Sequence, residues 1–373
     1  MQYCASLANG GGFPMNQQIR FCTSFDGVRL AYATSGAGTP MVMSASWLTH
    51  LEHQWRSLAW KPWLEHFSGR HTLVRYDSRG SGLSDREVDE FSFELWIRDF
   101  EAVIDAAGFD KFCMLGTCQG GPVAIEYAAR HPERVSQLVL YGTYARGLLM
   151  RPEIPLQAER AQVLHDMLRL GWGQDSQALL QVWASLFQPG GGIEHLRSWS
   201  EHQRCSTSAE NAARLYQTTF EIDVQVSARR IRCPTLVINV EHDALVPLEE
   251  GRRLANLIPG ARFATLDSIN HMLLPEEPAW QQMVREVEAF LDETAPPPEV
   301  AVGARFSTLT SRERQVLEEI ARGSDNTEIA ACLELSEKTV RNHVTRVFDK
   351  IGVGHRYQAI VMARDAGFGR ASR

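Results

Sequence analysis

The stretch KFCMLGTCQGGPVAIEYAARHPERV, residues 111–135, decides the fold. In it an apolar run ends in a tight corner, G-T-C-Q-G, and a helical pattern begins directly afterwards. A strand that turns sharply into a helix needs small neighbours at the corner, and Gly116 and Gly120 supply them. Cys118 stands at the corner itself, where the dipole of the following helix favours a thiolate or a developing oxyanion. The stretch therefore predicts a cysteine nucleophile, although free cysteines are most often small buried hydrophobes.

Around this corner, short apolar runs alternate with helical patterns. A hairpin is predicted at Asp26-Gly27, and further strand-like runs cover residues 40–45, 72–77, 111–116, 137–142, 235–240 and 261–266. Their Val, Leu, Ile and Met content predicts burial on both faces. Helical stretches such as 93–108 lie between them. This alternation indicates the α/β class, with a doubly wound, mostly parallel sheet covered by helices.

The alternation stops between about residues 145 and 231, where helical patterns follow one another without strands. We expect a helical cap inserted above the sheet. Its Trp172, Trp183 and Trp199 favour an apolar pocket under the cap, or else they form the core of the cap itself.

Two further segments supply partners for a nucleophile. Asp243 follows the run 235–240, and His271 follows the next run, which gives the chain order nucleophile, acid, base. Residues at the carboxyl ends of neighbouring parallel strands meet at one edge of the sheet. His271 would then receive the proton of Cys118 or form an ion pair with its thiolate, and Asp243 would hold the imidazole in the useful tautomer. His242 is the alternative histidine.

Residues 19–292 resemble the α/β-hydrolase fold. The resemblance rests on the D-x-R-G-x-G-x-S segment at 77–84, the elbow at 116–120, Asp243 in a D-x-x-V-P context and the late His271. It implies an oxyanion hole made by the backbone N–H of Gln119 and one from the loop after the third strand. Many members have H-G-x-P in that loop, whereas this chain has A-S-W-L at 45–48. By position, the resemblance implies that the backbone N–H of Trp47 is the second donor of the oxyanion hole.

The cysteine sets the expected chemistry. A thiolate attacks activated acyl groups such as lactones, enol esters and thioesters, but it is also a good leaving group, so an amide adduct collapses backward. With a cysteine at the nucleophile position, the chain resembles the dienelactone-hydrolase branch of the family more than the serine esterases. A sensor could use the same chemistry through a reversible adduct or a slowly hydrolysed acyl-enzyme, or it could bind its ligand without a bond.

Composition and cysteine spacing indicate the class of protein and its expected location. The chain has 373 residues, 44% of them hydrophobic, and its seven cysteines are scattered and never spaced C-x-x-C. Neither a disulfide framework nor a zinc knuckle is indicated, and we predict no cofactor and no metal. No apolar run approaches the length of about 18 residues that a membrane span needs, and the first residues lack a signal-peptide pattern. The expected location is the cytoplasm, without membrane association.

The chain is predicted to divide into two domains. Residues 1–18 are expected to be a disordered extension, with Met1 or Met15 as the start, and 19–292 to be the hydrolase-like domain. Residues 293–305, with three consecutive prolines, read as a linker, and 306–373 as a small all-α domain. From residue 303 the chain has 12 Lys+Arg and 9 Asp+Glu, net +3, which leaves 26 and 36, net −10, for the rest. An acidic body thus precedes a mildly basic tail.

Four short helices are predicted in the tail. Thr310 with Glu313 and Asp325 with Glu328 form capping boxes, and Ser336 caps the third helix. Apolar side chains occupy one face of the third helix, at positions 340, 344, 347, 348 and 351. The opposite face carries Lys338, Arg341, Asn342, Thr345 and Arg346. Such a helix suits the DNA major groove, although basic faces are usually just solvated.

The tail resembles the LuxR-type helix-turn-helix. The matching segments are L-T-x-R-E, G-x-x-N-x-E-I-A from Gly323, S-x-x-T-V-R-x-H from Ser336 and K-I-x-V-x-x-R-x-x-A from Lys350. The resemblance implies binding to double-stranded DNA, with a fourth helix at 357–366 that dimerises the protein at least on DNA. Position implies base contacts by Arg341, Asn342 and Thr345. It implies phosphate contacts by Lys338, Thr339, His343, Arg346 and Lys350. Asp325 replaces the usual Ser or Thr, and its charge is expected to weaken a nearby phosphate contact.

Three hypotheses follow from one chain that joins both patterns. In the first, the protein is a transcriptional regulator. Its hydrolase-like domain binds a small hydrophobic molecule, with or without a chemical reaction, and the resulting change is passed to the helix-turn-helix. In the second, it is an active cysteine hydrolase whose tail localises it or regulates its own operon. In the third, the pocket is vestigial and only oligomerises, which the suitable residues at all three triad positions disfavour.

Overall fold

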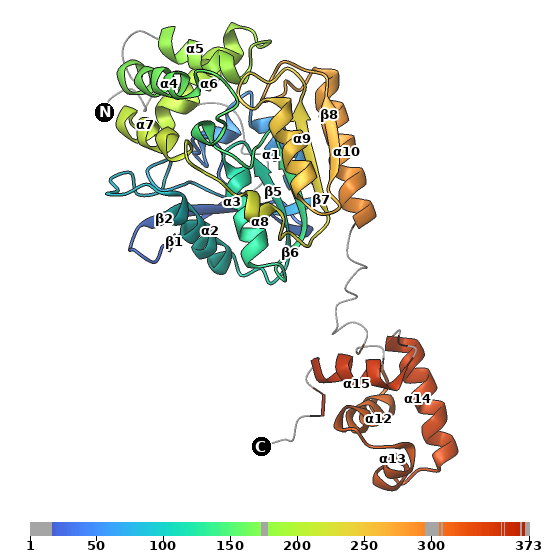
Figure 1. Ribbon diagram of the computed structural model, residues 1–373. Helices are drawn as coiled ribbons and strands as arrows, with labels where there is room; N and C mark the ends of the chain where they lie inside the picture. Colours follow the sequence, from blue (N-terminus) through green and yellow to red (C-terminus); the bar gives the residue numbers. More distant parts are fainter. Residues whose placement is uncertain are drawn as a thin grey trace. The chain divides into compact units, whose positions relative to one another are not determined.

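The computed structural model describes residues 17–172, 178–294, 306, 309–351, 353, 355–365 and 368–369. The chain divides into two compact units, Met1–Ala295 and Pro296–Arg373 (Figure 1). The predicted extension, apart from its last two residues, and nearly all of the predicted linker lie outside the described residues. Among the described residues, no helix is both long and apolar enough to cross a bilayer.

The first unit is built on one eight-stranded sheet with the order β1-β2-β4-β3-β5-β6-β7-β8. Its strands are β1 (Gln18–Thr23), β2 (Arg29–Ser35), β3 (Thr39–Met43), β4 (His71–Tyr76), β5 (Phe112–Thr117), β6 (Val135–Tyr141), β7 (Thr235–Val240) and β8 (Arg262–Leu266). Strand β2 pairs antiparallel with both of its neighbours, β1 and β4, and β3 to β8 pair in parallel. All predicted strands are present. The prediction of burial on both faces is wrong for β8, where only Leu266 is buried, because this strand forms an edge of the sheet.

Helices cover both faces of the sheet (Figure 1). On one face lie α1 (Lys61–Ser68) and α10 (Pro278–Thr294), which meet where the rings of Trp63 and Trp280 pack edge to face. The other face carries α2 (Phe93–Ala107), α3 (Gly120–Arg130), α8 (Gln225–Ala228) and α9 (Leu248–Leu257), each in contact with the next. Short 3₁₀ turns occur at η1 (His53–Trp55) and η2 (Leu148–Met150).

Four helices between β6 and β7 gather beyond the sheet, and they are green to yellow-green in Figure 1. They are α4 (Gln157–Gly171), α5 (Ala178–Phe187), α6 (Ile193–Ser206) and α7 (Ala209–Thr218). Trp172 and Trp199 are buried in packing: the Trp172 indole N–H donates to the Thr207 carbonyl, and Trp199 stacks near Trp60. Of the three tryptophans singled out in the sequence, Trp183 lines the cavity described below.

The second unit holds α12 (Ser311–Arg322), α13 (Asn326–Cys332), α14 (Glu337–Ile351) and α15 (Arg356–Asp365) around its own core. Both predicted capping boxes form, at Thr310 with Glu313 and at Asp325 with Glu328. The Ser336 hydroxyl accepts from the Thr339 backbone N–H at 3.2 Å, ahead of α14. These caps satisfy the first backbone donors of each helix, which fixes where the helices begin.

Candidate functional site

The corner between β5 and α3 holds Cys118 in a strained conformation. Its φ is +50°, in the left-handed region that side chains other than glycine rarely adopt. Two hydrogen bonds fix it: the Cys118 backbone N–H donates to the Tyr141 carbonyl at 3.1 Å, and the Thr143 hydroxyl donates to the Cys118 carbonyl at 2.5 Å. Tyr141 is the last residue of β6 and Thr143 follows it, so the neighbouring strand holds the corner in place.

The glycines around the corner are required by crowding. A Cβ on Gly120 would lie 2.7 Å from the Ala45 carbonyl oxygen, and one on Gly121 would lie 1.9 Å from the Thr143 hydroxyl oxygen. A Cβ on Gly116 would lie 2.8 Å from Cβ of Ala124. The predicted need for small residues here therefore has an identified cause at each glycine.

Asp243 and His271 meet at the carboxyl edge of the sheet, after β7 and β8. Nδ1 of His271 lies 2.6 Å from Oδ2 of Asp243, and both side chains are buried. Oδ1 of Asp243 accepts from the backbone N–H groups of Leu245 and Val246 at 2.8 and 3.1 Å. Because both carboxylate oxygens have donors, Asp243 is fixed as an acceptor for the histidine.

His271 also lies close enough to Cys118 for the thiol group to influence its pKa. Burial alone lowers the pKa of His271, but the charges of Asp243 and of a Cys118 thiolate outweigh it and raise this pKa to about 10. The surroundings of His271 therefore favour the protonated form of its imidazole. The structure brings the three predicted triad residues together in the predicted order.

His242, the alternative histidine, has a different environment. It is exposed, and it lies with the exposed Glu241 and Asp267 in a group whose possible ligand atoms are all within 4.8 Å of one another. Exposed acidic groups of this kind are common on protein surfaces. Of the two candidate histidines, it is His271 whose ring hydrogen bonds with the Asp243 carboxylate.

A cavity of about 250 Å³ opens beside Cys118, between the sheet edge and the helices α4, α5 and α7. Its described lining comprises Trp47, Cys118, Gln119, Tyr144, Leu148, Arg151, Gln157, Arg160, Leu164, Trp183, Leu186, Phe187, Tyr216, Thr219, Ala244, Leu245, Val246 and Pro247. Most of these side chains are apolar or aromatic. The volume is slightly below the range of about 300–1,000 Å³ typical of drug-sized ligands, so the cavity suits a small molecule.

The two predicted oxyanion residues, Gln119 and Trp47, both line this cavity. Within the described part of the chain, neither backbone N–H donates a hydrogen bond to another protein group. The loop that carries Trp47 is held by the turn 77–84: the Leu51 N–H donates to the Asp77 carboxylate at 3.2 Å, and the Ser78 N–H donates to the Thr49 hydroxyl at 3.1 Å. This explains the local need for the D-x-R-G-x-G-x-S segment.

Several polar side chains of the cavity, Tyr144, Arg151 and Gln157 among them, were not singled out from the sequence. Tyr144 and Arg151 lie in the segment between β6 and α4, and Gln157 is the first residue of α4. No motif or periodic pattern marks them, because their positions depend on how the inserted helices pack. The polarity of the pocket is therefore knowable only from the fold.

In the second unit, α14 presents the face predicted to meet DNA. Lys338, Arg341, Asn342, Thr345 and Arg346 are all exposed. On the opposite side of the helix, positions 340, 347 and 351 are fully buried in the core of this unit. The five side chains are thus free of the packing that holds the helix and available to an external partner.

The remaining predicted phosphate contacts differ in environment. Thr339 and His343 are half-buried, and Nδ1 of His343 is buried without a hydrogen-bond partner among the described residues. The Lys350 ammonium donates to Oε2 of Glu313 at 2.6 Å, so its charge already has a partner inside the unit. Asp325 uses its carboxylate to accept from the Thr327 and Glu328 backbone N–H groups.

Comparison with known families agrees with this geometry. The family described as alpha/beta hydrolase fold matches residues 49–278, which is more than half of the chain, and the family of bacterial regulatory proteins, luxR family, matches residues 307–363. The chain belongs to the alpha/beta hydrolase fold family, and its C-terminal unit is a LuxR-type helix-turn-helix domain. It is thus a fusion of a hydrolase-fold domain and a DNA-binding domain of a regulator type.

Individual relatives resemble the first unit. The putative carbamate hydrolase RutD of Azorhizobium caulinodans is 29% identical over 244 residues, covering 64% of this chain and 86% of that protein. 3-Oxoadipate enol-lactonase 2 of Acinetobacter baylyi is 26% identical over 269 residues, covering 71% of this chain and 93% of that protein. An esterase from Exiguobacterium antarcticum shares the fold with a TM-score of 0.62 at 19% identity, covering 74% of this chain and all of that one.

Proposed function

We propose that this protein is a ligand-responsive transcriptional regulator that detects a small, hydrophobic acyl compound with a Cys118–His271–Asp243 triad. The observation that carries the proposal is the hydrogen bond between Asp243 and His271, with His271 close to Cys118 at the wall of an apolar cavity. The same chain carries a LuxR-type domain. A chain with both features is suited to convert occupancy of the cavity into a change in DNA binding.

In the proposed chemistry, the Cys118 thiolate attacks the carbonyl carbon of an activated ester, lactone or thioester. The carbonyl electron pair moves to oxygen, where the backbone N–H groups of Gln119 and Trp47 would stabilise the negative charge. Collapse of this intermediate breaks the bond to the leaving group, which takes its proton from the His271 imidazolium. The products of this half-reaction are an acyl thioester on Cys118 and an alcohol or thiol, which is released from an ester or thioester and stays attached to the acyl group of an opened lactone.

Hydrolysis would complete the cycle. Neutral His271 takes a proton from water, the resulting hydroxide attacks the thioester, and the carboxylic acid leaves as the Cys118 thiolate is restored. Asp243 keeps the His271 imidazole oriented and stabilises its charge in both halves. The relatives named as a carbamate hydrolase and an enol-lactonase support acyl compounds as the class of ligand. Slow hydrolysis would make the acylated protein a long-lived signal.

For DNA, we propose that α14 lies in the major groove with Arg341, Asn342 and Thr345 at the base edges. Lys338, Thr339, His343 and Arg346 would contact phosphates, and Lys350 would do so while shared with Glu313. The exposed position of most of this face supports the assignment. Binding as a homodimer to two half-sites follows from the LuxR-type resemblance.

Coupling requires that the ligand bind two states of the protein with different affinity. The cap helices α4, α5 and α7, which line the cavity, are the elements whose position an acyl group on Cys118 would alter most directly. We propose that acylation favours one placement of these helices and thereby one state of DNA binding.

A Cys118→Ala variant tests the proposal in a reporter strain that carries the native promoter region and is supplied with p-nitrophenyl butyrate. Two quantities are measured: hydrolysis of the ester by purified protein, and reporter output in response to the ester. Loss of both identifies the chemistry as part of the signal. Loss of hydrolysis with an intact response indicates a receptor that binds without a bond, and intact hydrolysis refutes Cys118 as the nucleophile.

The second candidate is an active cysteine hydrolase whose tail localises it on DNA or regulates its own operon. The complete triad and the named hydrolase relatives favour it. It predicts fast turnover and a reporter output that does not change with the ester. The same pair of measurements separates it from the regulator.

A further inference from the structure

The lining of this cavity includes a buried arginine. Arg151 follows the η2 turn, its side chain is only 2% exposed, and it lines the same cavity as Cys118. A buried guanidinium carries five N–H donors that must each find an acceptor, since an unpaired buried donor is costly. The question is which acceptors the protein itself provides.

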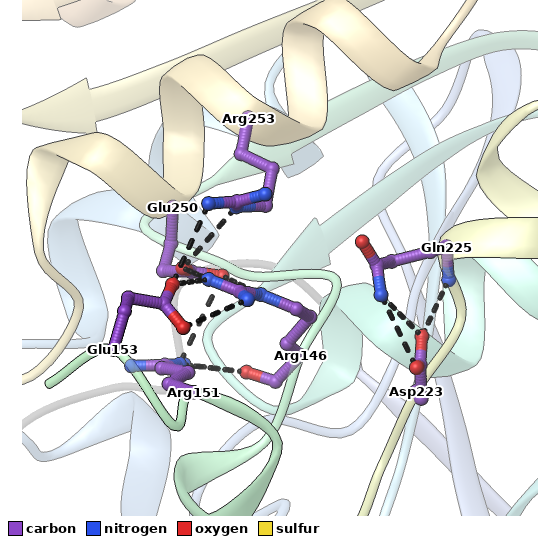
Figure 2. A network of polar contacts seen from close by, with 7 residues as sticks. All are labelled: Arg146, Arg151, Glu153, Asp223, Gln225, Glu250 and Arg253. Carbon is purple, nitrogen blue, oxygen red and sulfur yellow. Dashed lines mark hydrogen bonds and ion pairs between the residues drawn. The ribbon is translucent and has the colours of Figure 1, made fainter.

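The protein satisfies one side of this guanidinium. Nε and Nη2 of Arg151 donate to the Arg146 main-chain carbonyl at 2.9 and 2.6 Å, as Figure 2 shows. Nε also lies 3.8 Å from Oε2 of Glu250. Nη1 is buried and has no hydrogen-bond partner among the described residues. The described part of the protein therefore provides no acceptor for Nη1 of Arg151. A ligand could supply that acceptor.

The nearby carboxylates are already engaged elsewhere. Glu250 lies 2.5 Å from Nη2 of Arg146, and Glu153 binds the same guanidinium (Figure 2). Arg253, from α9 like Glu250, approaches Glu250 at 3.7 Å. The carboxylates of Glu153 and Glu250 are thus shared among three arginines. The longest of these ion-pair distances is that between Arg151 and Glu250.

The charge of the cavity lining has one sign. The described lining includes Arg151 and the exposed Arg160, and it contains no Asp or Glu. In a largely apolar cavity with low local dielectric, this favours a ligand that brings a negative charge. The cap of an acidic body thus encloses a locally positive site.

Gln157 offers a second polar contact. This residue is buried, it lines the cavity, and its Oε1 has no hydrogen-bond partner among the described residues. A carboxamide can present either its oxygen or its NH₂ group by rotation about its last side-chain torsion. Both Arg151 and Gln157 therefore bring a polar atom without a partner among the described residues to the same cavity.

Tyr144 relates this polar group to the nucleophile. The Arg151 guanidinium lies over the Tyr144 ring, 5.1 Å from its centroid. The phenol also lies within electrostatic reach of Cys118. A small acyl compound could therefore place its carbonyl carbon at Cys118 and its other end at Arg151.

We propose that Arg151, with Gln157, binds a carboxylate at the far end of the acyl ligand. The ligand class is a monoanionic acyl compound, such as a half-ester of a dicarboxylic acid or a lactone that carries a free carboxylate, rather than a neutral fatty ester. This inference rests on the proposed function for the reacting end of the ligand. The carboxylate site itself stands on the unpaired Nη1 and the positive lining.

The test measures binding without chemistry, by isothermal titration calorimetry on the full-length chain with Cys118→Ala. The probes are monomethyl adipate, which carries a carboxylate at neutral pH, and dimethyl adipate, which is neutral and nearly the same shape. The monoester should bind about 10- to 100-fold more tightly, the range that a charge-assisted hydrogen bond to a buried group supplies. Adding Arg151→Gln should remove this preference while the diester changes by less than about threefold.

Controls keep the outcome decisive. Arg253→Gln removes an arginine of the same ion-pair network outside the cavity, and the preference should remain. Arg151→Lys retains the charge and should retain part of the preference, which gives a second reading if Arg151→Gln does not fold. Equal affinity for the two esters in the parent protein, a preference that survives Arg151→Gln, or no binding of the monoester at millimolar concentration would each overturn the inference.

The proposed nucleophile is tested separately, with p-nitrophenyl acetate on the parent chain. No release of p-nitrophenolate would refute Cys118 as the nucleophile and leave the calorimetric result on the carboxylate site standing. Release of p-nitrophenolate with equal calorimetric affinities would refute the carboxylate site alone.

Discussion

Replacing Asp243 by asparagine isolates the electrostatic part of the triad. Asparagine has nearly the same shape, and its amide oxygen can still accept from the Leu245 and Val246 backbone N–H groups. Its NH₂ group would face Nδ1 of His271, which selects the tautomer that carries a proton on Nε2. The negative charge that raises the pKa of His271 would be gone.

The magnitude follows from the pKa of His271, which burial lowers and which Asp243 and a Cys118 thiolate raise to about 10. At pH 8 an imidazole with this pKa is about 99% protonated, whereas one at or below about 6.5 is at most about 3% protonated. The imidazolium that stabilises a thiolate at Cys118 is then present about 30 times less often. Alkylation of Cys118 at pH 8 should therefore fall about 30-fold in Asp243→Asn.

The assay is alkylation by iodoacetamide with quantification of the Cys118 peptide by mass spectrometry, so that the other cysteines do not interfere. Glu241→Gln is the matched control, because it removes an exposed carboxylate two residues away and should leave the rate unchanged. An Asp243→Asn rate within threefold of the parent at pH 8 would refute the proposed ion pair.

Three further predictions concern stability and DNA. Gly121→Ala should reduce the free energy of unfolding in urea by about 1–3 kcal/mol, because its Cβ would lie 1.9 Å from the Thr143 hydroxyl oxygen, and an unchanged value would contradict the crowded elbow. Because the folded pKa of His271 is raised to about 10, its stabilising contribution should be full below pH of about 6.5 and lost as pH rises through about 10. The melting temperature of the parent should therefore fall more over this window than that of His271→Gln, and parallel declines would contradict it. Arg341→Ala should reduce the free-energy difference between binding to the operator and to a mutated operator by about 1–3 kcal/mol. Lys338→Ala should instead weaken binding to all sequences and reduce the slope of log affinity against log salt concentration by about 0.9. The reverse pattern would refute the assignment of base and phosphate contacts.

Much of the fold was predictable because local patterns and tertiary structure agree. The apolar runs of the parallel strands are continuous where helices cover both faces, and they lose burial at β8 because an edge strand has a neighbour on one side only. The caps at Thr310 and Asp325 are local, since each side chain satisfies donors within its own first turn. Such features depend only on a few adjacent residues.

The meeting of the three candidate triad positions was predictable from the sequence, and the lining of the pocket was not. Cys118, Asp243 and His271 each follow a strand, and parallel strands bring such positions to one edge. Arg151 belongs to an inserted segment with no repeating pattern, and its importance depends on which of its donors the packing leaves unpaired. Lys350 shows the same limit, because the partner of its ammonium, Glu313, is 37 residues away.

The central claim is that Cys118 is the acyl acceptor in the cavity. Intact-protein mass spectrometry tests it most directly, on the full-length chain incubated with p-nitrophenyl butyrate and on the Cys118→Ala variant treated alike. We predict a mass increase of one butyryl group on the parent chain, mapped to Cys118 by peptide analysis, and no increase on the variant. An unmodified parent chain in a sample rapidly quenched during the reaction, or a butyryl group that persists in Cys118→Ala, would contradict the claim.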